Sequence, residues 1–348
     1  MGTKAYFAGL DLVRCAAAFL VLFYHFTYAS WMPGGTAQAA SLGVAEFKEV
    51  SWFSSAGWVG VQIFFVISGF VIAQSAEEKT ARQFGIGRIR RLFPSILICA
   101  SVTALVAFAF DVWSADSLAR RYFATLVLWP VGPWIDGVYW TLTIEAMFYA
   151  AIFLLVAGGK VSCLEEFAVL LGSISAIYLL AVSKLGFHST DLHSFWRYGC
   201  YFALGMMLWI IVSQGVRPRR LFIAAVFVGA GLLEISGAGL PGAKALGSAL
   251  WIVSLVVICA TTYWRVPGND WTRRVGLMTY PLYLVHQLVG SAILRLTPWT
   301  GKYVALAVAI AATASFAWFV VDVEKPLWRA MAAGVQRVRQ LRSQNMPT

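Results

Sequence analysis

The first apolar stretch of the chain, residues 9–26, carries three ionisable side chains, Asp11, Arg14 and His25. Such groups are costly at membrane depth, at roughly 2.5–3.5 kcal/mol for an Asp or Arg at the centre of a spanning helix. On a helix, Arg14 and His25 share one face and lie about 16 Å apart along the axis, with Asp11 one turn before Arg14. This polar stripe predicts a polar cavity between helices. The alternative is an interhelical hydrogen-bond staple, which needs fewer than three such groups.

Two further ionisable residues, Glu145 and His286, also fall inside apolar stretches. A carboxylate beside an imidazole holds the tautomer of the ring and raises its basicity. Glu145 is therefore expected to form a dyad with His25 if their helices are adjacent. His286 is consistent with either a core histidine or a cavity-lining one, and Tyr283 shares its helix face.

The composition indicates a membrane protein. Of its 348 residues 60% are hydrophobic and only 12% are charged, whereas about 25% of the residues of soluble domains are charged. Apolar stretches recur from end to end, which favours one membrane domain over two soluble ones. The five cysteines are scattered and form no disulfide framework. His188 and His193 are too loosely spaced for a metal site, so no metal is expected.

Runs of about 20 apolar residues are long enough to cross a bilayer. The sequence therefore predicts an all-α integral membrane fold of about ten transmembrane helices, near residues 8–30, 56–75, 92–110, 138–157, 162–183, 192–212, 220–237, 245–264, 275–296 and 303–321. The segment 118–137 is too short and too rich in Pro and Gly to span, and it is interpreted as a re-entrant or interfacial loop.

The Lys and Arg residues are distributed unequally between the two sides of the predicted membrane domain. If both termini are cytoplasmic, 18 of the 27 Lys and Arg residues lie on the cytoplasmic side and 7 on the outer side. This asymmetry predicts cytoplasmic termini. It also accounts for the net charge of +11 without a nucleic-acid partner. Residues 1–326 are predicted to form the membrane domain, and the basic tail 327–348 a cytoplasmic segment that contacts anionic membrane lipids.

Six segments resemble, in order, the motifs of the acyltransferase-3 family of integral membrane O-acyltransferases. They read "GLDLVRCAAAFLVLFYHF", "GWVGVQIFFVISGFVIA", "GRIRRLFP", "VYWTLTIEAMFY", "TYPLYLVH" and "VEKPL". The sequence departs from the family pattern where Gln62 replaces a frequent acid and where Thr141 and Thr279 replace Ser. Because no esterase-like domain follows Pro326, the chain resembles the stand-alone members.

The resemblance implies a multi-pass protein of the bacterial inner membrane that transfers an acyl group, here an acetyl group, from cytoplasmic acyl-CoA. Acetyl-CoA would be a donor substrate, with no cofactor tightly bound. The acceptor would be a hydroxyl of an exported or cell-surface glycan or of a lipid-linked saccharide. His25 would act as general base or transient acyl carrier, supported by Glu145, and Arg14 would stabilise charge at the thioester.

The donor phosphates are assigned to the arginine cluster of the third motif, because arginine forks bind phosphate well. These residues are Arg88, Arg90 and Arg91, and the alternative is that they only enforce topology. The residues predicted to line the substrate cavity are Asp11, Ser68, Trp140, Thr141, Tyr283 and His286.

A polar path through a helical bundle also suits a secondary transporter or a lipid-linked glycan flippase. Transporters often contain two related halves and helices interrupted near the midplane. The sequence has neither feature apart from the broken segment 118–137. Transfer of an acyl group from acyl-CoA by the purified protein would distinguish the enzyme from the transporter.

Overall fold

The computed structural model describes residues 6–32, 44–185, 194–237 and 241–344. Within these ranges all regular secondary structure is helical, and ten helices are long and apolar enough to cross a membrane. The predicted fold class and the predicted number of spans are therefore confirmed. His188 and His193 lie outside the described residues.

The spans and shorter helices follow one another through the whole described chain. In order they are α1 (Ala8–Tyr24), η1 (His25–Ala29), η2 (Lys48–Val50), α3 (Ser51–Ser54), η3 (Gly57–Val59), α4 (Gly60–Glu78), α5 (Ala81–Ala109), α6 (Ala115–Leu126), η4 (Gly137–Tyr139), α7 (Trp140–Ala157), η5 (Val161–Cys163), α8 (Leu164–Leu185), α9 (Ser194–Gln214), α10 (Pro218–Gly237), α11 (Pro241–Tyr263), α12 (Asp270–Leu296), η7 (Pro298–Thr300) and α13 (Lys302–Gln344).

The third span begins earlier than the hydropathy pattern predicts, at Ala81 instead of residue 92. A capping box between Thr80 and Gln83 starts the helix, because each side chain bonds the backbone N–H of the other residue. The resulting 29-residue helix is about 43 Å long and continues through Pro94. The arginine cluster of the third motif consequently lies on a rigid helix and not in a loop at its mouth.

Small residues allow α4 to pack at the centre of the bundle. A Cβ atom built on Gly69 would lie 2.2 Å from the carbonyl oxygen of Phe202 in α9, and one on Gly60 would lie 2.4 Å from that of Ala17 in α1. Close backbone approach through small residues is the usual way that membrane helices pack. α4 and α12 are the most enclosed spans, and both of them line the cavity described below.

The segment between α5 and α7 does not span the bundle. α6 is a 12-residue helix that packs along α5, and it is followed by non-helical residues 127–136. The last two of these, Ile135 and Asp136, are fully buried. This segment therefore enters the bundle and carries the start of α7 inside it.

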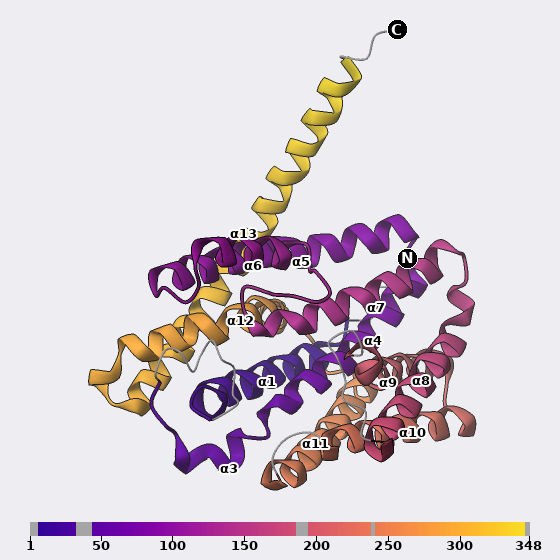
Figure 1. The fold of residues 1–348 in the computed structure, drawn as a ribbon. Coiled ribbons are helices and arrows are strands. Elements are labelled where there is room, and N and C mark those ends of the chain that lie inside the picture. Colours follow the sequence, from indigo (N-terminus) through magenta and orange to yellow (C-terminus); the bar gives the residue numbers. More distant parts are fainter. Residues whose placement is uncertain (1–5, 33–43, 186–193, 238–240, 345–348) are drawn as a thin grey trace.

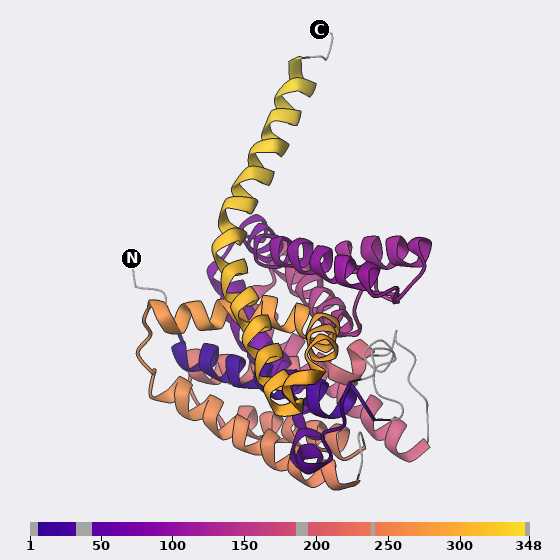
Figure 2. The same ribbon diagram turned by 90° about the vertical axis from the view of Figure 1, so that its left-hand side faces the viewer.

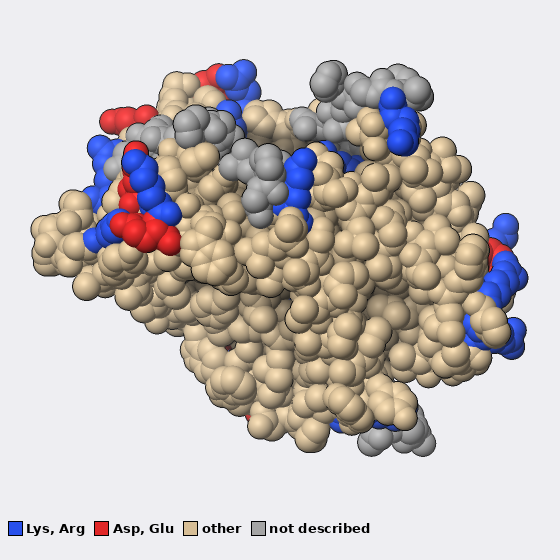
Figure 3. Space-filling view, turned by 90° about the horizontal axis from the view of Figure 1, so that it is seen from below, with Lys and Arg blue, Asp and Glu red and all other residues tan. Residues whose placement is uncertain are grey.

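The surface fits a membrane environment. One face of the molecule has a broad uncharged band with Lys, Arg, Asp and Glu gathered towards its edges (Figure 3). The helices of the bundle pack side by side, and the last turns of α13 project away from them (Figures 1 and 2). The domain boundary predicted at Pro326 falls inside α13, which is continuous, and it stays a prediction.

The start of α1 lies beside the end of α4 and the start of α12, and we call this face of the bundle the terminal face. It includes the start of α1 and the connections between α4 and α5, α7 and α8, α9 and α10, and α11 and α12. That this face is cytoplasmic stays a prediction.

Candidate active site

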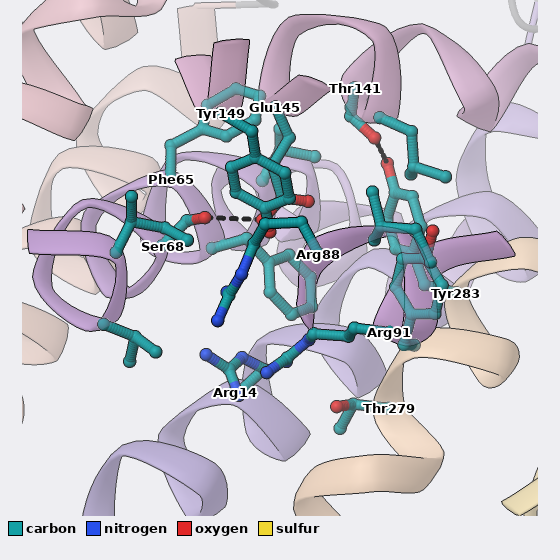
Figure 4. A pocket seen from close by; sticks show the side chains of 17 residues that line it. Arg14, Phe65, Ser68, Arg88, Arg91, Thr141, Glu145, Tyr149, Thr279 and Tyr283 are labelled. Carbon is teal, nitrogen blue, oxygen red and sulfur yellow. Dashed lines mark hydrogen bonds between the residues drawn. The ribbon is translucent and has the colours of Figure 1, made fainter. Parts of the chain in front are cut away.

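Five helices enclose a cavity inside the bundle (Figure 4). Its volume is about 60 Å³. The lining side chains come from α1, α4, α5, α7 and α12, and they are Arg14, Val61, Phe64, Phe65, Ser68, Val71, Ile72, Arg88, Arg91, Leu92, Thr141, Leu142, Glu145, Tyr149, Thr279, Tyr280 and Tyr283.

Three guanidinium groups, those of Arg14, Arg88 and Arg91, converge at this cavity (Figure 4). Arg14 donates to Asp11 over 2.9 Å, and Arg88 Nη2 donates to the Ser75 hydroxyl over 3.3 Å. Arg91 donates no hydrogen bond to any residue that the structure describes.

The charges in and beside the cavity do not cancel. The inner cavity is lined by the three arginines and by the carboxylate of Glu145, and Asp11 pairs with Arg14, which leaves a formal excess of one positive charge among these five groups. Arginine forks bind phosphate and carboxylate groups bidentately. The cavity is therefore suited to hold an anion.

A second cavity of about 580 Å³ leads from the terminal face to these arginines. It shares Arg14, Arg88 and Arg91 with the inner cavity and is also lined by Lys79 and Arg273. An anionic molecule has a wide basic approach from this face and a narrow space beyond the three arginines.

Glu145 is held by two hydroxyl groups on the cavity wall. Ser68 and Tyr149 both donate to Glu145 Oε1, each over 2.5 Å. Tyr149 follows Glu145 by one helical turn, so the spacing on α7 brings the two side chains together. Nearby, the Thr141 hydroxyl donates to the Tyr283 hydroxyl over 3.1 Å. These bonds fix one wall of the cavity.

His25 lies beyond this cavity, next to His286. Their ring centroids are 5.0 Å apart. His25 is the first residue of η1, a π-helical turn that continues α1, and such turns are frequent at functional sites. His286 Nδ1 lies 2.7 Å from the carbonyl oxygen of Tyr283. His25 Nδ1 and His286 Nε2 are buried without a partner among the described residues.

The predicted contact between Glu145 and His25 is not made. Asp136, just before α7, accepts a hydrogen bond from the backbone N–H of Leu288, two residues beyond His286, so α7 begins level with the histidine pair. Glu145 follows Asp136 by nine residues and lies about 13 Å further along the helix. Counting depth along the apolar run places the start of α7 at the membrane surface, whereas its first residues are already inside the bundle.

Asp136 itself is a fully buried carboxylate that joins two elements. Its Oδ1 accepts from the Val138 N–H over 3.4 Å and its Oδ2 from the Leu288 N–H over 2.9 Å. Burial raises the pKa of Asp136 from 3.8 to about 7, because the charged form loses its hydration. The backbone N–H groups oppose this rise in pKa only in part.

The remaining predicted residues divide between the cavities and other surroundings. Ser68, Thr141 and Tyr283 lie on the wall of the inner cavity, and Asp11 lies on the wall of the outer one. Trp140 does not line either cavity and packs against Tyr198, with ring centroids 5.1 Å apart and the ring planes tilted by 39°.

Arg90 is exposed and also lies outside both cavities. It borders a cleft of about 260 Å³ together with Glu324, Lys325 and Trp328, and Arg91 lines this cleft as well as the two cavities.

Sequence reasoning missed two contributors. Tyr149 could have been found from its spacing of four residues from Glu145. Gly276 could not have been found, because its role is spatial: a Cβ atom there would lie 2.3 Å from Asp11 Cγ. Gly276 therefore leaves the space that the carboxylate of Asp11 occupies beside Arg14.

The fold and the site define a multi-pass membrane protein with a basic cavity suited to an anion and, beyond it, two histidines that each have one buried ring nitrogen without a partner among the described residues. The chain belongs to the acyltransferase-3 family, because the model of that family's acyltransferase domain matches residues 7–322. It is thus a membrane-bound O-acyltransferase with an acyl donor. This membership favours an enzyme over the transporter or flippase considered above.

Three relatives are distant in sequence. An O-acetyl transferase of Shigella phage Sf6 is 28% identical over 159 residues, which cover 40% of this chain and 43% of the phage protein. A candidate membrane-bound transacylase, BcsY, of Komagataeibacter xylinus is 25% identical over 318 residues, which cover 80% of this chain and 71% of that protein. Nodulation protein 10 of Rhizobium leguminosarum bv. viciae is 23% identical over 306 residues, with coverages of 76% and 80%. No solved structure matches the chain.

Proposed function

We propose that this enzyme transfers an acetyl group from cytoplasmic acetyl-CoA to a hydroxyl group of an exported or cell-surface glycan, and that it does so in the bacterial inner membrane. The observation that carries the proposal is the convergence of Arg14, Arg88 and Arg91 on one cavity that opens widely to the terminal face. The name of the phage relative, an O-acetyl transferase, supports acetyl as the transferred group.

The donor end of the reaction is assigned to the arginines. A coenzyme A thioester carries several phosphates at one end and its acyl group at the end of a long flexible arm. In this proposal Arg88 and Arg91 hold phosphates in the outer cavity while the arm enters the inner one. Arg14, fixed by Asp11, stabilises negative charge on the entering donor.

The acceptor end is assigned to the histidine pair. His25 follows Arg14 by 11 residues, which corresponds to about 16 Å along the helix. The arm of the donor bridges this separation and delivers the thioester carbonyl to His25. The narrow inner cavity, with Phe64 and Tyr283 on its wall, lies along this route.

The chemical step is a direct acyl transfer. The acceptor oxygen attacks the thioester carbonyl carbon, His25 accepts the hydroxyl proton, the C–S bond breaks, and the coenzyme A thiolate leaves and is protonated. The same geometry allows His25 to carry the acyl group transiently before the hydroxyl attacks.

The role of His286 follows from its tautomer. When the neutral ring donates from Nδ1 to the Tyr283 carbonyl, its Nε2 is an unprotonated acceptor. That nitrogen can orient the acceptor hydroxyl beside His25.

Glu145 has a different role from the one the sequence suggested. Its carboxylate lies among the arginines and binds Ser68 and Tyr149. It is proposed to offset part of the positive charge and to hold the cavity wall in place, and not to act on His25. The basic segment 327–348 is proposed to contact anionic lipids at the cytoplasmic surface.

The function is tested with purified protein in proteoliposomes and radiolabelled acetyl-CoA. The acceptor is the polysaccharide fraction extracted from a strain that lacks the protein, because that fraction retains unmodified hydroxyl groups. The proposal expects label in the polysaccharide as an alkali-labile ester. Consumption of acetyl-CoA with label only in lipid or peptide would contradict the glycan acceptor.

A further inference from the structure

One face of α12 extends the wall of the inner cavity towards the opposite end of the bundle. Tyr280 and Tyr283 line the cavity, and Gln287 and Ser291 follow at helical spacings of four residues from Tyr283. Residues at these spacings share one helix face. Gln287 and Ser291 therefore lie about 6 and 12 Å beyond Tyr283, away from the arginines.

The polar atoms of this continuation are buried and have no protein partner. Gln287 and Ser291 are each 1% exposed. Neither the oxygen nor the nitrogen of the Gln287 amide has a hydrogen-bond partner among the described residues, and neither does the Ser291 hydroxyl. His286 Nε2 and His25 Nδ1 share this property, and their rings lie 5.0 Å apart.

Buried polar groups in folded proteins nearly always have a partner, since leaving them unpaired is costly. Single exceptions occur elsewhere in this bundle, such as Trp251 Nε1 in α11. By contrast, eight such atoms among the described residues lie on α12 and the adjoining η1, and four of them, on His286, Gln287 and Ser291, fall within six positions of one helix. A concentration of this kind points to a ligand that supplies the missing partners.

The chemistry of the unpaired atoms defines the ligand class. The Gln287 amide offers one acceptor and two donors in a plane, and the Ser291 hydroxyl can donate and accept. Neither side chain is charged, so the ligand is neutral at this point. Adjacent hydroxyl groups on a sugar ring both donate and accept, and they match this pattern.

We propose that His25, His286, Gln287 and Ser291 form the acceptor site, in which Gln287 and Ser291 bind the non-reacting hydroxyls of a sugar ring. The imidazoles then face the hydroxyl that is acylated. This assignment rests on the proposed function, because it takes a glycan as the acceptor. Donor and acceptor would enter the bundle from opposite ends and meet at the histidine pair.

The test separates acceptor binding from donor binding. Gln287→Leu removes the amide with little change in volume, and Ser291→Ala is a smaller change that preserves folding if the first does not. Trp251→Phe is the matched control, since it removes an equally buried and unpaired donor in α11. Each variant is assayed in proteoliposomes with acetyl-CoA and the polysaccharide fraction from the strain lacking the protein, and its melting temperature is measured.

Gln287→Leu and Ser291→Ala should each raise the apparent KM for the polysaccharide roughly tenfold, the scale of one well-placed hydrogen bond. The KM for acetyl-CoA and the melting temperature should stay near those of the wild type, as should both KM values of Trp251→Phe. An unchanged polysaccharide KM in both Gln287→Leu and Ser291→Ala, or an equal rise in Trp251→Phe, would overturn the acceptor site. Absence of polysaccharide acetylation by the wild type would instead refute the proposed function, and the site assignment would fall with it.

Discussion

Gly276→Ala tests whether the pairing of Asp11 with Arg14 matters for donor binding. Gly276 faces Asp11 across the contact between α12 and α1, and an added Cβ atom would lie 2.3 Å from Asp11 Cγ and 2.6 Å from Asp11 Cβ. A change of rotamer can move the carboxylate, but the Asp11 Cβ is fixed to the backbone of α1. To restore ordinary contact at 3.4 Å or more, the two helices must separate by about 0.8 Å.

This separation acts directly on Arg14. Asp11 holds the guanidinium with a 2.9 Å hydrogen bond, and the overpacked variant either displaces the carboxylate or moves α1 with it. Overpacking of this size costs about 1–3 kcal/mol. If about half of that cost falls on the donor site, the KM for acetyl-CoA rises roughly two- to tenfold. The KM for the polysaccharide should not change, because the histidine pair lies about 16 Å away.

The assay measures both KM values in proteoliposomes. Gly229→Ala in α10 is the matched control, since a Cβ atom there meets nothing within 4 Å and the substitution should be neutral or slightly stabilising. A wild-type donor KM in Gly276→Ala would refute the reasoning, as would an equal rise in Gly229→Ala.

Three other predictions concern charged groups. Arg91→Ala should raise the KM for acetyl-CoA at least tenfold, and Arg91→Lys should restore it in part. Arg90→Ala should leave this KM unchanged, because Arg90 lies outside the cavity. Equal effects of the two alanine substitutions would refute the assigned phosphate site. Glu145→Gln should alter the donor KM severalfold without moving the acid limb of the pH–rate profile. A shifted acid limb would instead indicate that the Glu145 carboxylate acts on His25. Because the pKa of folded Asp136 is raised to about 7, wild-type stability should fall by about 2–3 kcal/mol relative to Asp136→Asn as pH rises from 5 to 8. Parallel melting curves across that range would contradict this.

The number of spans could be predicted from the sequence because hydropathy depends only on composition within a window. The ten apolar runs match the ten candidate spans, although α5 begins eleven residues earlier than its apolar run. That difference has a physical cause: a capping box and helix-favouring residues extend the helix beyond the apolar segment. Hydropathy detects the part of a helix that lies in lipid, not the whole helix.

Arg14, His25 and His286 could also be identified from the sequence, since ionisable groups inside apolar runs are conspicuous. Arg88 and Arg91 lie before the apolar run of their helix and could be identified from the third motif. Their grouping could not. Glu145 binds Ser68 and Tyr149, because the entry of residues 127–136 into the bundle sets the depth of α7. Depth counted from the end of a hydrophobic run ignores such a segment.

The polar continuation of α12 was invisible for a related reason. Gln287 and Ser291 are unremarkable in the sequence, and only burial without a partner distinguishes them. Hydrogen-bond satisfaction is a property of the folded surroundings and cannot be read from spacing alone.

The most direct test of the account is acetyl transfer by His25→Ala. The variant is purified, reconstituted and assayed with labelled acetyl-CoA and the polysaccharide fraction from the strain lacking the protein. Loss of the imidazole should reduce transfer by on the order of 10²-fold or more, the scale of a general-base contribution. Membrane insertion and the binding of acetyl-CoA should be unchanged, because the arginines are intact. Transfer at the wild-type rate by a folded His25→Ala protein would contradict the central claim and remove His25 from the mechanism.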